Sequence, residues 1–287
     1  MKAKVQIDID SIGCIKCKAC VDVCPAAIFV NGSSQIELQN INTCISCGHC
    51  VAICPKDVIT HSRFGEGKVH TVEAGAKVDS DELLNLMRLR RSNRSMTSKP
   101  IPQQSLDKII EAAFRAPTAS NIQGLKFVLV QDRKVLDSII DITLDYFRGL
   151  MNMVDKPIVR PLAMKINSDI AKYFKAFKRM LEQRAEGEDP VLRGATAMLI
   201  IYTDPKVRFG VQDSNLAYQN ASLMAESLGV AQVYTGFVCM VADSDKKQKL
   251  QKLLGIEGTI HAGMALGMPS RTFSKYIDKK PIDLKII

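Results

Sequence analysis

Apolar and polar residues alternate in two short stretches near the N-terminus, residues 26–38 (AAIFVNGSSQIEL) and residues 57–72 (DVITHSRFGEGKVHTV). The first stretch contains an Asn-Gly pair, and the second contains a Gly-Glu-Gly segment. Alternation with a period of two on either side of such a turn is typical of a β-hairpin. We therefore predict a short hairpin in each stretch.

Beyond residue 75 the apolar positions follow a helical period. A helix is predicted to begin at a cap formed by Asp79 or Ser80. Apolar residues then follow at helical spacing: Leu83, Leu84 and Met87. This change of pattern divides the chain into a predicted first domain at residues 1–75 and a second at residues 76–287, as its length of 287 residues also suggests.

Two further helical stripes lie in the second domain. The first follows a Pro-bounded turn and has five apolar positions: Leu106, Ile109, Ile110, Ala113 and Phe114. It leads through a loop of small polar residues to a predicted strand at residues 127–130. The second stripe lies within residues 140–185 and contains Tyr146, Phe147, Tyr173, Phe174, Phe177, Met180 and Leu181. Such a stripe ordinarily packs in a core.

The composition is that of a globular protein, with 46% hydrophobic and 24% charged residues. The formal net charge is +9, but residues 1–75 carry seven basic and seven acidic side chains, so the whole excess lies downstream. The downstream charges are scattered along predicted helices and do not form one stripe interleaved with aromatic residues. This distribution favours a solvated basic face or an anionic cofactor, and no nucleic acid is expected as a partner.

No apolar run reaches the length of a signal-peptide core or the ~18 uninterrupted apolar residues of a membrane span. We therefore expect a cytoplasmic protein with no membrane partner. Because cytosolic thiols stay reduced, the cysteines are expected to bind metal, and a disulfide framework is the weaker alternative.

Eight of the nine cysteines form two copies of one spacing, C-x2-C-x2-C-x3-C-P, which ends at Pro25 in the first copy and at Pro55 in the second. The cysteines are Cys14, Cys17, Cys20 and Cys24, then Cys44, Cys47, Cys50 and Cys54. Paired zinc knuckles also use CxxC pairs, but their two pairs are farther apart than four thiols within eleven residues. The spacing is that of the bacterial ferredoxin run, in which three thiolates bind one 4Fe–4S cluster and the fourth binds the other.

Residues 1–72 resemble the two-cluster bacterial ferredoxins. One predicted ligand set is Cys14, Cys17, Cys20 and Cys54, and the other is Cys44, Cys47, Cys50 and Cys24. His49 lies inside the second ligand loop, and because all eight thiols are present we expect it to be exposed or to hydrogen-bond near the cluster. Such a domain carries single electrons and performs no chemistry on a substrate.

Cationic and hydroxyl side chains gather where the first predicted helix ends: Arg88, Arg90, Arg91, Ser92, Arg94 and Ser95. Each guanidinium can bond two phosphate oxygens, so the group suits a phosphate. A solvated basic helix end, favoured by the helix dipole, is the alternative. On charge alone both interpretations stay open.

Four segments occur in a specific order: RRSNRS (90–95), APTASNIQ (116–123), SNLAYQNASLMAESLGVAQVYTGF (214–237) and ALGMPSRTFSKYIDKKP (265–281). Through them, residues 80–287 resemble the nitroreductase family of FMN-dependent oxidoreductases. That family has an R-x-S-x-R-type phosphate site and a P-S/T-x-x-N-x-Q loop. The resemblance implies an α+β sandwich, a mostly antiparallel sheet flanked by helices, after the ferredoxin-like α+β domain.

The resemblance also implies an FMN site built from two subunits of a homodimer. The phosphate and ribityl chain would be held by Arg90, Arg91, Ser92 and Arg94, with Lys279 completing the phosphate clamp. The second subunit would contribute a loop containing Pro117, Thr118 and Asn121. The reactive side of the flavin ring would face the backbone of Thr235 and Gly236. In this family the region corresponding to residues 140–185 overhangs the flavin, so its aromatic side chains are either core or pocket wall.

The chain departs from the family pattern at two places. The turn at residues 233–236 reads VYTG where the family often has Pro-x-Glu-Gly, and Gln123 is followed by Gly-Leu where many members have Pro-Trp. Both changes count against direct use of NAD(P)H without excluding it. Elsewhere, His261 is expected in a core strand, and Cys239 is expected to be a buried, unreactive thiol.

In such enzymes the flavin performs the redox chemistry, so no catalytic side chain is predicted. We expect an oxidoreductase that passes electrons between the clusters and FMN to a nitroaromatic, quinone or activated enone, with reduced ferredoxin as the one-electron donor. One alternative is an NAD(P)H-dependent reductase whose clusters export electrons. Another is a redox sensor or electron-transfer module with no substrate of its own. Oxygen-sensitive clusters further indicate an anaerobe.

Overall fold

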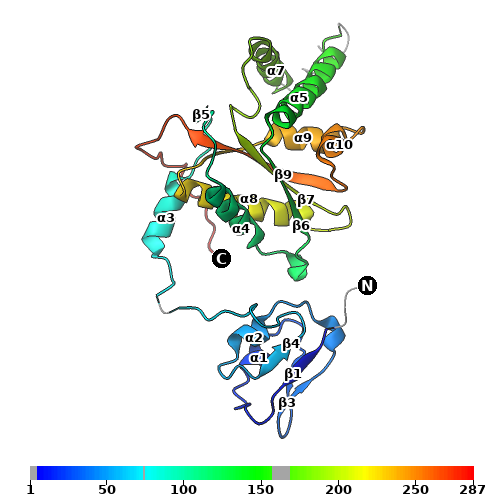
Figure 1. Ribbon diagram of the computed structural model, residues 1–287, viewed down its shortest axis with the longest axis vertical. Helices are drawn as coiled ribbons and strands as arrows, with labels where there is room; N and C mark the ends of the chain where they lie inside the picture. Colours follow the sequence, from blue (N-terminus) through cyan, green and yellow to red (C-terminus); the bar gives the residue numbers. More distant parts are fainter. Residues whose placement is uncertain (1–4, 74, 157–168) are drawn as a thin grey trace. The chain divides into compact units, whose positions relative to one another are not determined.

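The computed structural model describes residues 5–73, 75–156 and 169–287. The chain forms two compact units, both coloured along the sequence in Figure 1. The first unit contains Met1–Val78 and Ala119–Ile122, and the second contains Asp79–Thr118 and Gln123–Ile287.

Two antiparallel strand pairs and two short helices build the first unit. The strand pairs are β1 (Ile7–Ile9) with β4 (Ile59–His61), and β2 (Phe29–Asn31) with β3 (Ile36–Leu38). The helices are α1 (Ala19–Val23) and α2 (His49–Ile53), and a 3-10 turn, η1 (Ile41–Thr43), precedes α2. Their apolar side chains meet in one small core that includes Ile7, Ile28, Phe29, Ile36 and Ile59.

The hairpin predicted in residues 26–38 is confirmed, because β2 and β3 pair around the Asn-Gly turn. The hairpin predicted in residues 57–72 is wrong. That stretch contains one strand, β4, and its partner is β1, with Ile7 opposite His61. The N-terminal strand supplies the apolar edge that β4 needs, while the Gly-Glu-Gly segment stays an exposed turn.

A five-stranded, wholly antiparallel sheet forms the centre of the second unit. Its strands are β5 (Met96–Thr97), β6 (Leu125–Val130), β7 (Ala197–Thr203), β8 (Ala231–Tyr234) and β9 (Thr259–Pro269). The order is β5-β9-β7-β6, and β8 also pairs with β9. The strand predicted at residues 127–130 is β6, which begins two residues earlier.

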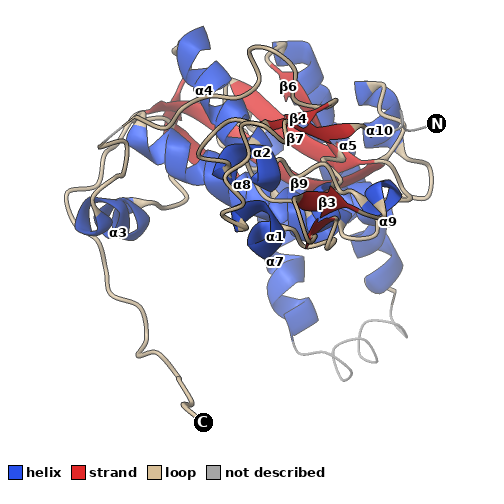
Figure 2. Cartoon of the chain, turned by 90° about the horizontal axis from the view of Figure 1, so that it is seen from below, coloured by secondary structure: helices blue, strands red, loops and turns tan. Residues whose placement is uncertain are grey.

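Helices cover both faces of this sheet, as Figures 1 and 2 show. One face carries α4 (Gln103–Phe114) and α8 (Gly210–Ser227), and the other carries α5 (Arg133–Val154), α7 (Asp169–Ala185), α9 (Gly236–Ser244) and α10 (Lys249–Leu254). A hydrophobic core lies between the sheet and the helices on each face. Strand β7 contributes side chains to both cores: Leu199 and Ile201 to one, and Met198 and Ile200 to the other. The predicted α+β class with helices flanking an antiparallel sheet is confirmed.

Helix α3 (Ser80–Leu89) begins at the predicted position. The carboxylate of Asp79 accepts hydrogen bonds from the backbone N–H groups of Asp81 and Glu82, at 2.9 and 3.0 Å. Asp79 is therefore the cap, and Ser80 is the first helical residue. The helix is followed by the arginine-rich segment, which precedes β5.

Candidate functional site

The eight cysteines of the two runs line two small cavities in the first unit. One cavity is lined by Cys14, Cys17, Cys20 and Cys54, and the other by Cys24, Cys44, Cys47 and Cys50. Each run thus sends its fourth cysteine to the cavity of the other run. All nine cysteines are free thiols. Across the described ranges, no three or more His, Cys, Asp or Glu side chains converge closely enough to hold one metal ion.

Backbone donors point at thiols of the second cavity. The N–H of Ile28 lies 3.4 Å from Cys24 Sγ, and the N–H of Ser46 lies 3.3 Å from Cys44 Sγ. Such N–H groups stabilise negative charge on sulfur. Ser46 lies within the second cysteine run, whereas Ile28 follows the proline that closes the first run.

A histidine that the sequence pattern did not single out also reaches this cavity. The Nε2 atom of His61, at the end of β4, lies 3.5 Å from Cys44 Sγ, and the residue is 4% exposed. His49, which the pattern did single out, also lines this cavity, but it is exposed. His61 is seventeen residues from Cys44 in sequence, so only the fold brings the two together.

The arginine-rich segment after α3 is tied to the chain that follows β9. The Arg91 guanidinium donates to the carbonyl of Lys275 at 2.8 Å and lies 4.2 Å from the centre of the Phe273 ring. The Asn93 side chain donates to the carbonyl of Arg271 at 2.9 Å. These bonds fix the backbone of the predicted phosphate segment.

Gln232 of β8, which is 1% exposed, anchors the same segment to the sheet. The Tyr218 hydroxyl donates to Gln232 Oε1 at 2.6 Å, and Gln232 Nε2 donates to the carbonyl of Arg91 at 3.1 Å. The backbone N–H of Asn93 donates to the Gln232 carbonyl. Sequence reasoning missed Gln232, because a single glutamine in a strand carries no local signal.

A cavity of about 710 Å³ lies in the second unit. Its walls are predominantly apolar and come from α5, α7, the loop before β7, and the junction of β8 with α9. The lining residues are Arg94, Leu150, Met151, Val154, Tyr173, Phe174, Phe177, Pro190, Val191, Arg193, Val233, Tyr234, Thr235, Gly236, Phe237, Val238 and Met240. A mostly apolar cavity with a few polar groups is the usual form of a cofactor or small-molecule site.

The aromatic stripe of residues 140–185 divides between core and cavity wall. Phe147 is fully buried and stacks on Phe177, with ring centroids 4.1 Å apart. Phe237 packs edge-on against both rings. Phe177 also lines the cavity, together with Tyr173, which is 52% exposed. Met180 is buried in the core.

A turn after α7 carries Arg193, which lines the cavity. The Asp189 carboxylate accepts three backbone N–H bonds, from Val191, Leu192 and Gly194, at 2.7–3.1 Å. Arg193 has a left-handed backbone, with φ of 63°. Burial, and then the nearby Arg94 guanidinium, lower the pKa of Arg193 below its ordinary value.

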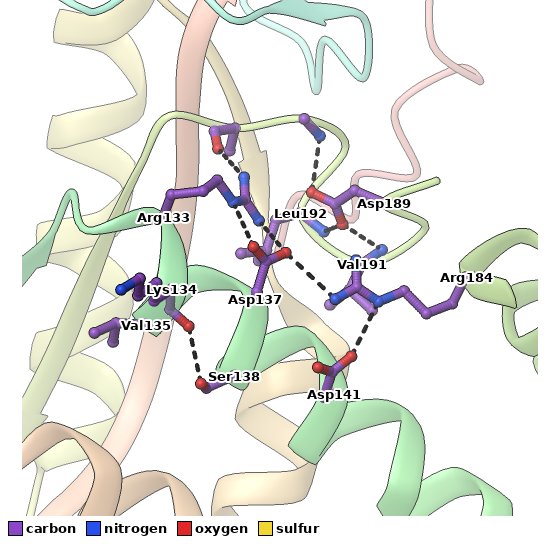
Figure 3. A network of polar contacts seen from close by, with 12 residues as sticks. Arg133, Lys134, Val135, Asp137, Ser138, Asp141, Arg184, Asp189, Val191 and Leu192 are labelled. Carbon is purple, nitrogen blue, oxygen red and sulfur yellow. Dashed lines mark hydrogen bonds and ion pairs between the residues drawn. The ribbon is translucent and has the colours of Figure 1, made fainter. Parts of the chain in front are cut away.

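An ion-pair network holds this turn and the two helices of the cavity wall (Figure 3). Arg133 and Arg184 both bond Asp137, and Arg184 also bonds Asp141 at 3.0 Å. Arg133 further donates to the carbonyl of Ala195 at 3.3 Å. The guanidinium groups beside Asp137 lower its pKa. The network joins α5, α7 and the turn that carries Arg193.

Thr235 and Gly236 lie at the junction of β8 and α9, where both line the cavity. Thr235 is the N-cap residue of α9, and Gly236 is the first residue of the helix. The adjacent Tyr234 also lines the cavity, and burial raises the pKa of its hydroxyl to about 12. The cavity therefore meets the N-terminus of α9, where backbone N–H groups lack helical partners.

The predicted loop residues lie elsewhere. The hydroxyl of Thr118 accepts a bond from the backbone N–H of Gln123 at 3.0 Å, and the preceding Pro117 is exposed. Asn121 belongs to the segment 119–122 of the first unit, and there its Nδ2 donates to the carbonyl of Ser46 at 2.7 Å. This bond attaches the segment to the turn that carries the N–H donor to Cys44.

Three further residues from the sequence analysis have defined places. Lys279 lies in the exposed tail after β9 and makes no hydrogen bond or ion pair with another described residue. His261 lies on β9, where its Nε2 is 2.8 Å from the Thr203 hydroxyl. Burial raises the pKa of Cys239 to about 11, so this thiol is protonated at neutral pH.

In the part of the chain that the structure describes, every helix is too short or too polar to cross a membrane. Two family models match the sequence. One describes a 4Fe–4S dicluster domain and covers residues 13–59. The other describes the nitroreductase family and covers residues 87–268, more than half of the chain.

Relatives and solved structures match 67–72% of the chain. An FMN reductase (NAD(P)H) of Bacillus subtilis is 26% identical over 197 residues, which are 68% of this chain and 69% of that protein. An NADPH-dependent oxidoreductase of Staphylococcus aureus is 21% identical over 193 residues, 67% of this chain and 66% of that protein. A nitroreductase with bound FMN from Desulfitobacterium hafniense covers 72% of this chain and 98% of its own, with 21% identity and a TM-score of 0.55.

A nitroreductase with bound FMN from Bacteroides fragilis gives a similar result, with 20% identity, a TM-score of 0.54, and coverage of 72% of this chain and 98% of its own. At this identity the two solved structures show a shared fold. The family model itself spans α3 to β9 and includes the arginine-rich segment, the β8–α9 junction and the whole sheet. The chain therefore belongs to the nitroreductase family.

Proposed function

We propose that the protein is an iron–sulfur flavoprotein oxidoreductase, with a two-cluster ferredoxin domain at residues 1–75 and an FMN-binding domain at residues 76–287. It passes electrons between two 4Fe–4S clusters and FMN and reduces a small electrophilic acceptor, such as a nitroaromatic, a quinone or an activated enone. One observation carries the proposal: a single chain contains two four-thiol cavities and a large apolar cavity bordered by arginine.

The first unit fits two 4Fe–4S clusters by the number, type and position of its thiols. Each cavity has four cysteines, which is a complete ligand set for such a cluster. The N–H groups of Ile28 and Ser46 aim at ligand sulfurs, as expected where thiolates carry negative charge. Bound clusters would supply one-electron storage.

The second unit fits FMN at the large cavity. We assign Arg90, Arg91, Ser92 and Arg94 to the phosphate and ribityl chain, with Lys279 completing the clamp. Of these residues Arg94 lines the large cavity, whereas Arg91 lines a separate, smaller cavity, where its buried Nε has no hydrogen-bond partner among the described residues. Arg193 adds a second guanidinium at the cavity wall, beside Arg94.

The side chains of this cavity orient the reactants and exclude water. Bound FMN would supply the transfer of an electron pair to the acceptor. Thr235 and Gly236, which line the cavity, are assigned to the reactive side of the flavin ring, and the aromatic side chains of α7 in the cavity wall are assigned to the acceptor. The Tyr234 hydroxyl stays protonated at neutral pH and donates to the carbonyl of His261 at 3.4 Å.

We assign the functional form as a homodimer, in which Pro117, Thr118 and Asn121 line the FMN of the partner subunit. Exposed apolar side chains support a protein contact at two places. Leu83, Leu84 and Met87 of α3 are 41–46% exposed, and the tail after β9 exposes Ile282, Leu284, Ile286 and Ile287. Rows of large exposed apolar side chains commonly mark interfaces.

Reduced ferredoxin is the proposed donor, because a one-electron relay ahead of the flavin suits a one-electron carrier. The names of the two relatives support a second candidate, an NAD(P)H-dependent reductase whose clusters export electrons. The two candidates differ in the direction of electron flow. The donor preference therefore decides between them.

The test is an anaerobic purification followed by iron and FMN analysis and by flavin absorbance in two separate cuvettes, one with reduced ferredoxin and one with NAD(P)H. Rapid bleaching by ferredoxin alone supports the proposal, and a Cys47→Ser variant should lose that bleaching while keeping FMN. Rapid bleaching by NAD(P)H, with none from ferredoxin, would instead support the second candidate, in which electrons flow from FMN to the clusters. Absence of iron and FMN from the purified protein would refute both candidates.

A further inference from the structure

The two cysteine runs repeat in sequence, yet one position differs in character between their two halves. Six residues after the closing proline, the first half has Asn31 and the second half has His61. Asn31 ends β2 and is exposed, whereas His61 ends β4 and is 4% exposed. The repeat predicts equivalent cluster sites, and the structure makes them unequal.

The hydrogen bonds of His61 determine which ring nitrogen carries its proton. The backbone N–H of Arg63 lies 3.1 Å from His61 Nδ1. A backbone N–H can only donate, so Nδ1 is the acceptor and the proton of the neutral ring is on Nε2. The Nε2–H group therefore points to Cys44 Sγ, 3.5 Å away.

Three contacts hold the ring in this orientation. Strand pairing places His61 opposite Ile7 on β1, and the Arg63 N–H fixes the ring from the other side. The Phe64 ring lies against it, with centroids 4.8 Å apart at 44°. A Cβ added at Gly48, the N-cap residue of α2, would lie 3.2 Å from the Phe64 ring, so this ring packs close to the second ligand loop.

We propose that His61 is a positioning residue of the second cluster. The Nε2–H group of His61 donates to the Cys44 thiolate and raises the reduction potential of that cluster above the value that the cluster would have without this hydrogen bond. The bond strengthens on reduction, because the added electron increases the negative charge on the ligand sulfurs. The first cluster has Asn31 at the equivalent position, and its side chain faces solvent. His61 thus makes the two clusters electronically unlike. This inference rests on the proposed function, since it needs both clusters in place.

The test compares four full-length holoproteins by EPR-monitored redox titration: wild type, His61→Phe, His61→Gln and His49→Phe. His61→Phe keeps an aromatic ring but lacks the donor, whereas the Gln amide can still donate. His49→Phe is the matched control, because His49 also lines the second cavity but is exposed and, in the part of the chain that the structure describes, bonds no ligand thiol. Iron content is measured for each variant.

We expect His61→Phe to lower one of the two cluster potentials and to leave the other unchanged. The expected change is on the order of tenfold in the ratio of oxidised to reduced cluster at a fixed potential, or ~59 mV, as for one hydrogen bond to a charged acceptor. His61→Gln should shift that potential less, and His49→Phe should shift neither. Unchanged potentials in a fully loaded His61→Phe protein would overturn the inference, as would equal shifts in the Phe and Gln variants.

A measurement on the intact chain covers the case in which His61→Phe fails to assemble its clusters. Pulsed EPR of wild-type protein carrying 15N-labelled histidine should show nitrogen coupled to one reduced cluster, and His61→Gln should abolish that coupling. Coupling that is absent in wild type, or that survives the substitution, refutes the role of His61. A wild-type protein without any cluster signal would instead refute the proposed function.

Discussion

Gln232 offers a direct way to test how the sheet controls the predicted phosphate segment. Its side chain is 1% exposed and bonds two groups, the Tyr218 hydroxyl at 2.6 Å and the Arg91 carbonyl at 3.1 Å. A Gln232→Leu substitution keeps the approximate volume of the side chain and removes both of these hydrogen bonds. The Tyr218 hydroxyl, in a residue that is 9% exposed, and the half-buried Arg91 carbonyl would then lack hydrogen bonds.

The expected loss of stability follows from these two unsatisfied groups. A buried polar group that loses its partner destabilises a protein by ~1–3 kcal/mol, and the partly exposed Arg91 carbonyl belongs at the lower end of that range. We therefore expect the free energy of unfolding to fall by roughly 2–4 kcal/mol. The affinity for FMN should fall as well, because Arg91 is adjacent to Ser92 in the assigned phosphate segment.

Denaturant unfolding followed by circular dichroism measures the first effect, and titration of FMN fluorescence measures the second. Gln251→Leu is the matched control. Gln251 is also a buried glutamine, 6% exposed, and donates to the carbonyl of Ala242 at 2.9 Å, but that carbonyl belongs to α9 rather than to the phosphate segment. The control should lose stability and keep its FMN affinity. Equal FMN affinities in wild type and Gln232→Leu would refute the anchoring role.

Two other substitutions and one pH-dependent reaction have defined outcomes. Cys54→Ser should impair the cluster in the cavity that contains Cys14 and spare the other, so iron analysis and EPR should report one intact cluster; loss of the other cluster alone would contradict the ligand sets. Phe177→Ala removes a ring stacked on Phe147 and should lower the free energy of unfolding by ~3–5 kcal/mol while raising KM for aromatic acceptors, measured by denaturant titration and steady-state kinetics. The pKa of Cys239, about 11, predicts that peptide-resolved alkylation of this thiol accelerates by roughly tenfold per pH unit from pH 7 to 9, and a pH-independent rate would show a lower pKa.

Local features of the chain could be predicted from the sequence. The β2–β3 hairpin and the cap of α3 each depend on residues within a few positions of one another, and both are confirmed. The β4 partner was predicted wrongly, because β1 lies about fifty residues away and alternation alone does not identify a distant partner. The pattern showed which residues could form a strand, whereas the tertiary structure selected the pairing.

The same distinction applies to the candidate site. Cysteine spacing and the arginine-rich segment are continuous in sequence, so their chemistry could be predicted from residue types. Gln232 acts through Arg91, which is 141 positions away in the chain, and Arg193 lies near Arg94, which is also distant in sequence. One local signal was available for Arg193, since Asp189 followed by proline is typical of a turn, but that signal does not say what the turn faces.

The ferredoxin repeat shows why a sequence motif specifies the ligands of a cluster more readily than it specifies the reduction potential of that cluster. Both runs contain the same four cysteines and proline, so both are assigned the same kind of cluster. The sulfur environment is set outside the runs, by whether the strand after the proline ends on an exposed edge, as at Asn31, or in the core, as at His61. Both strands are paired at this position, His61 opposite Ile7 and Asn31 opposite Ile36. The residue that occupies the position, and not the cysteine spacing or the pairing alone, therefore decides whether an N–H donor reaches a ligand sulfur such as that of Cys44.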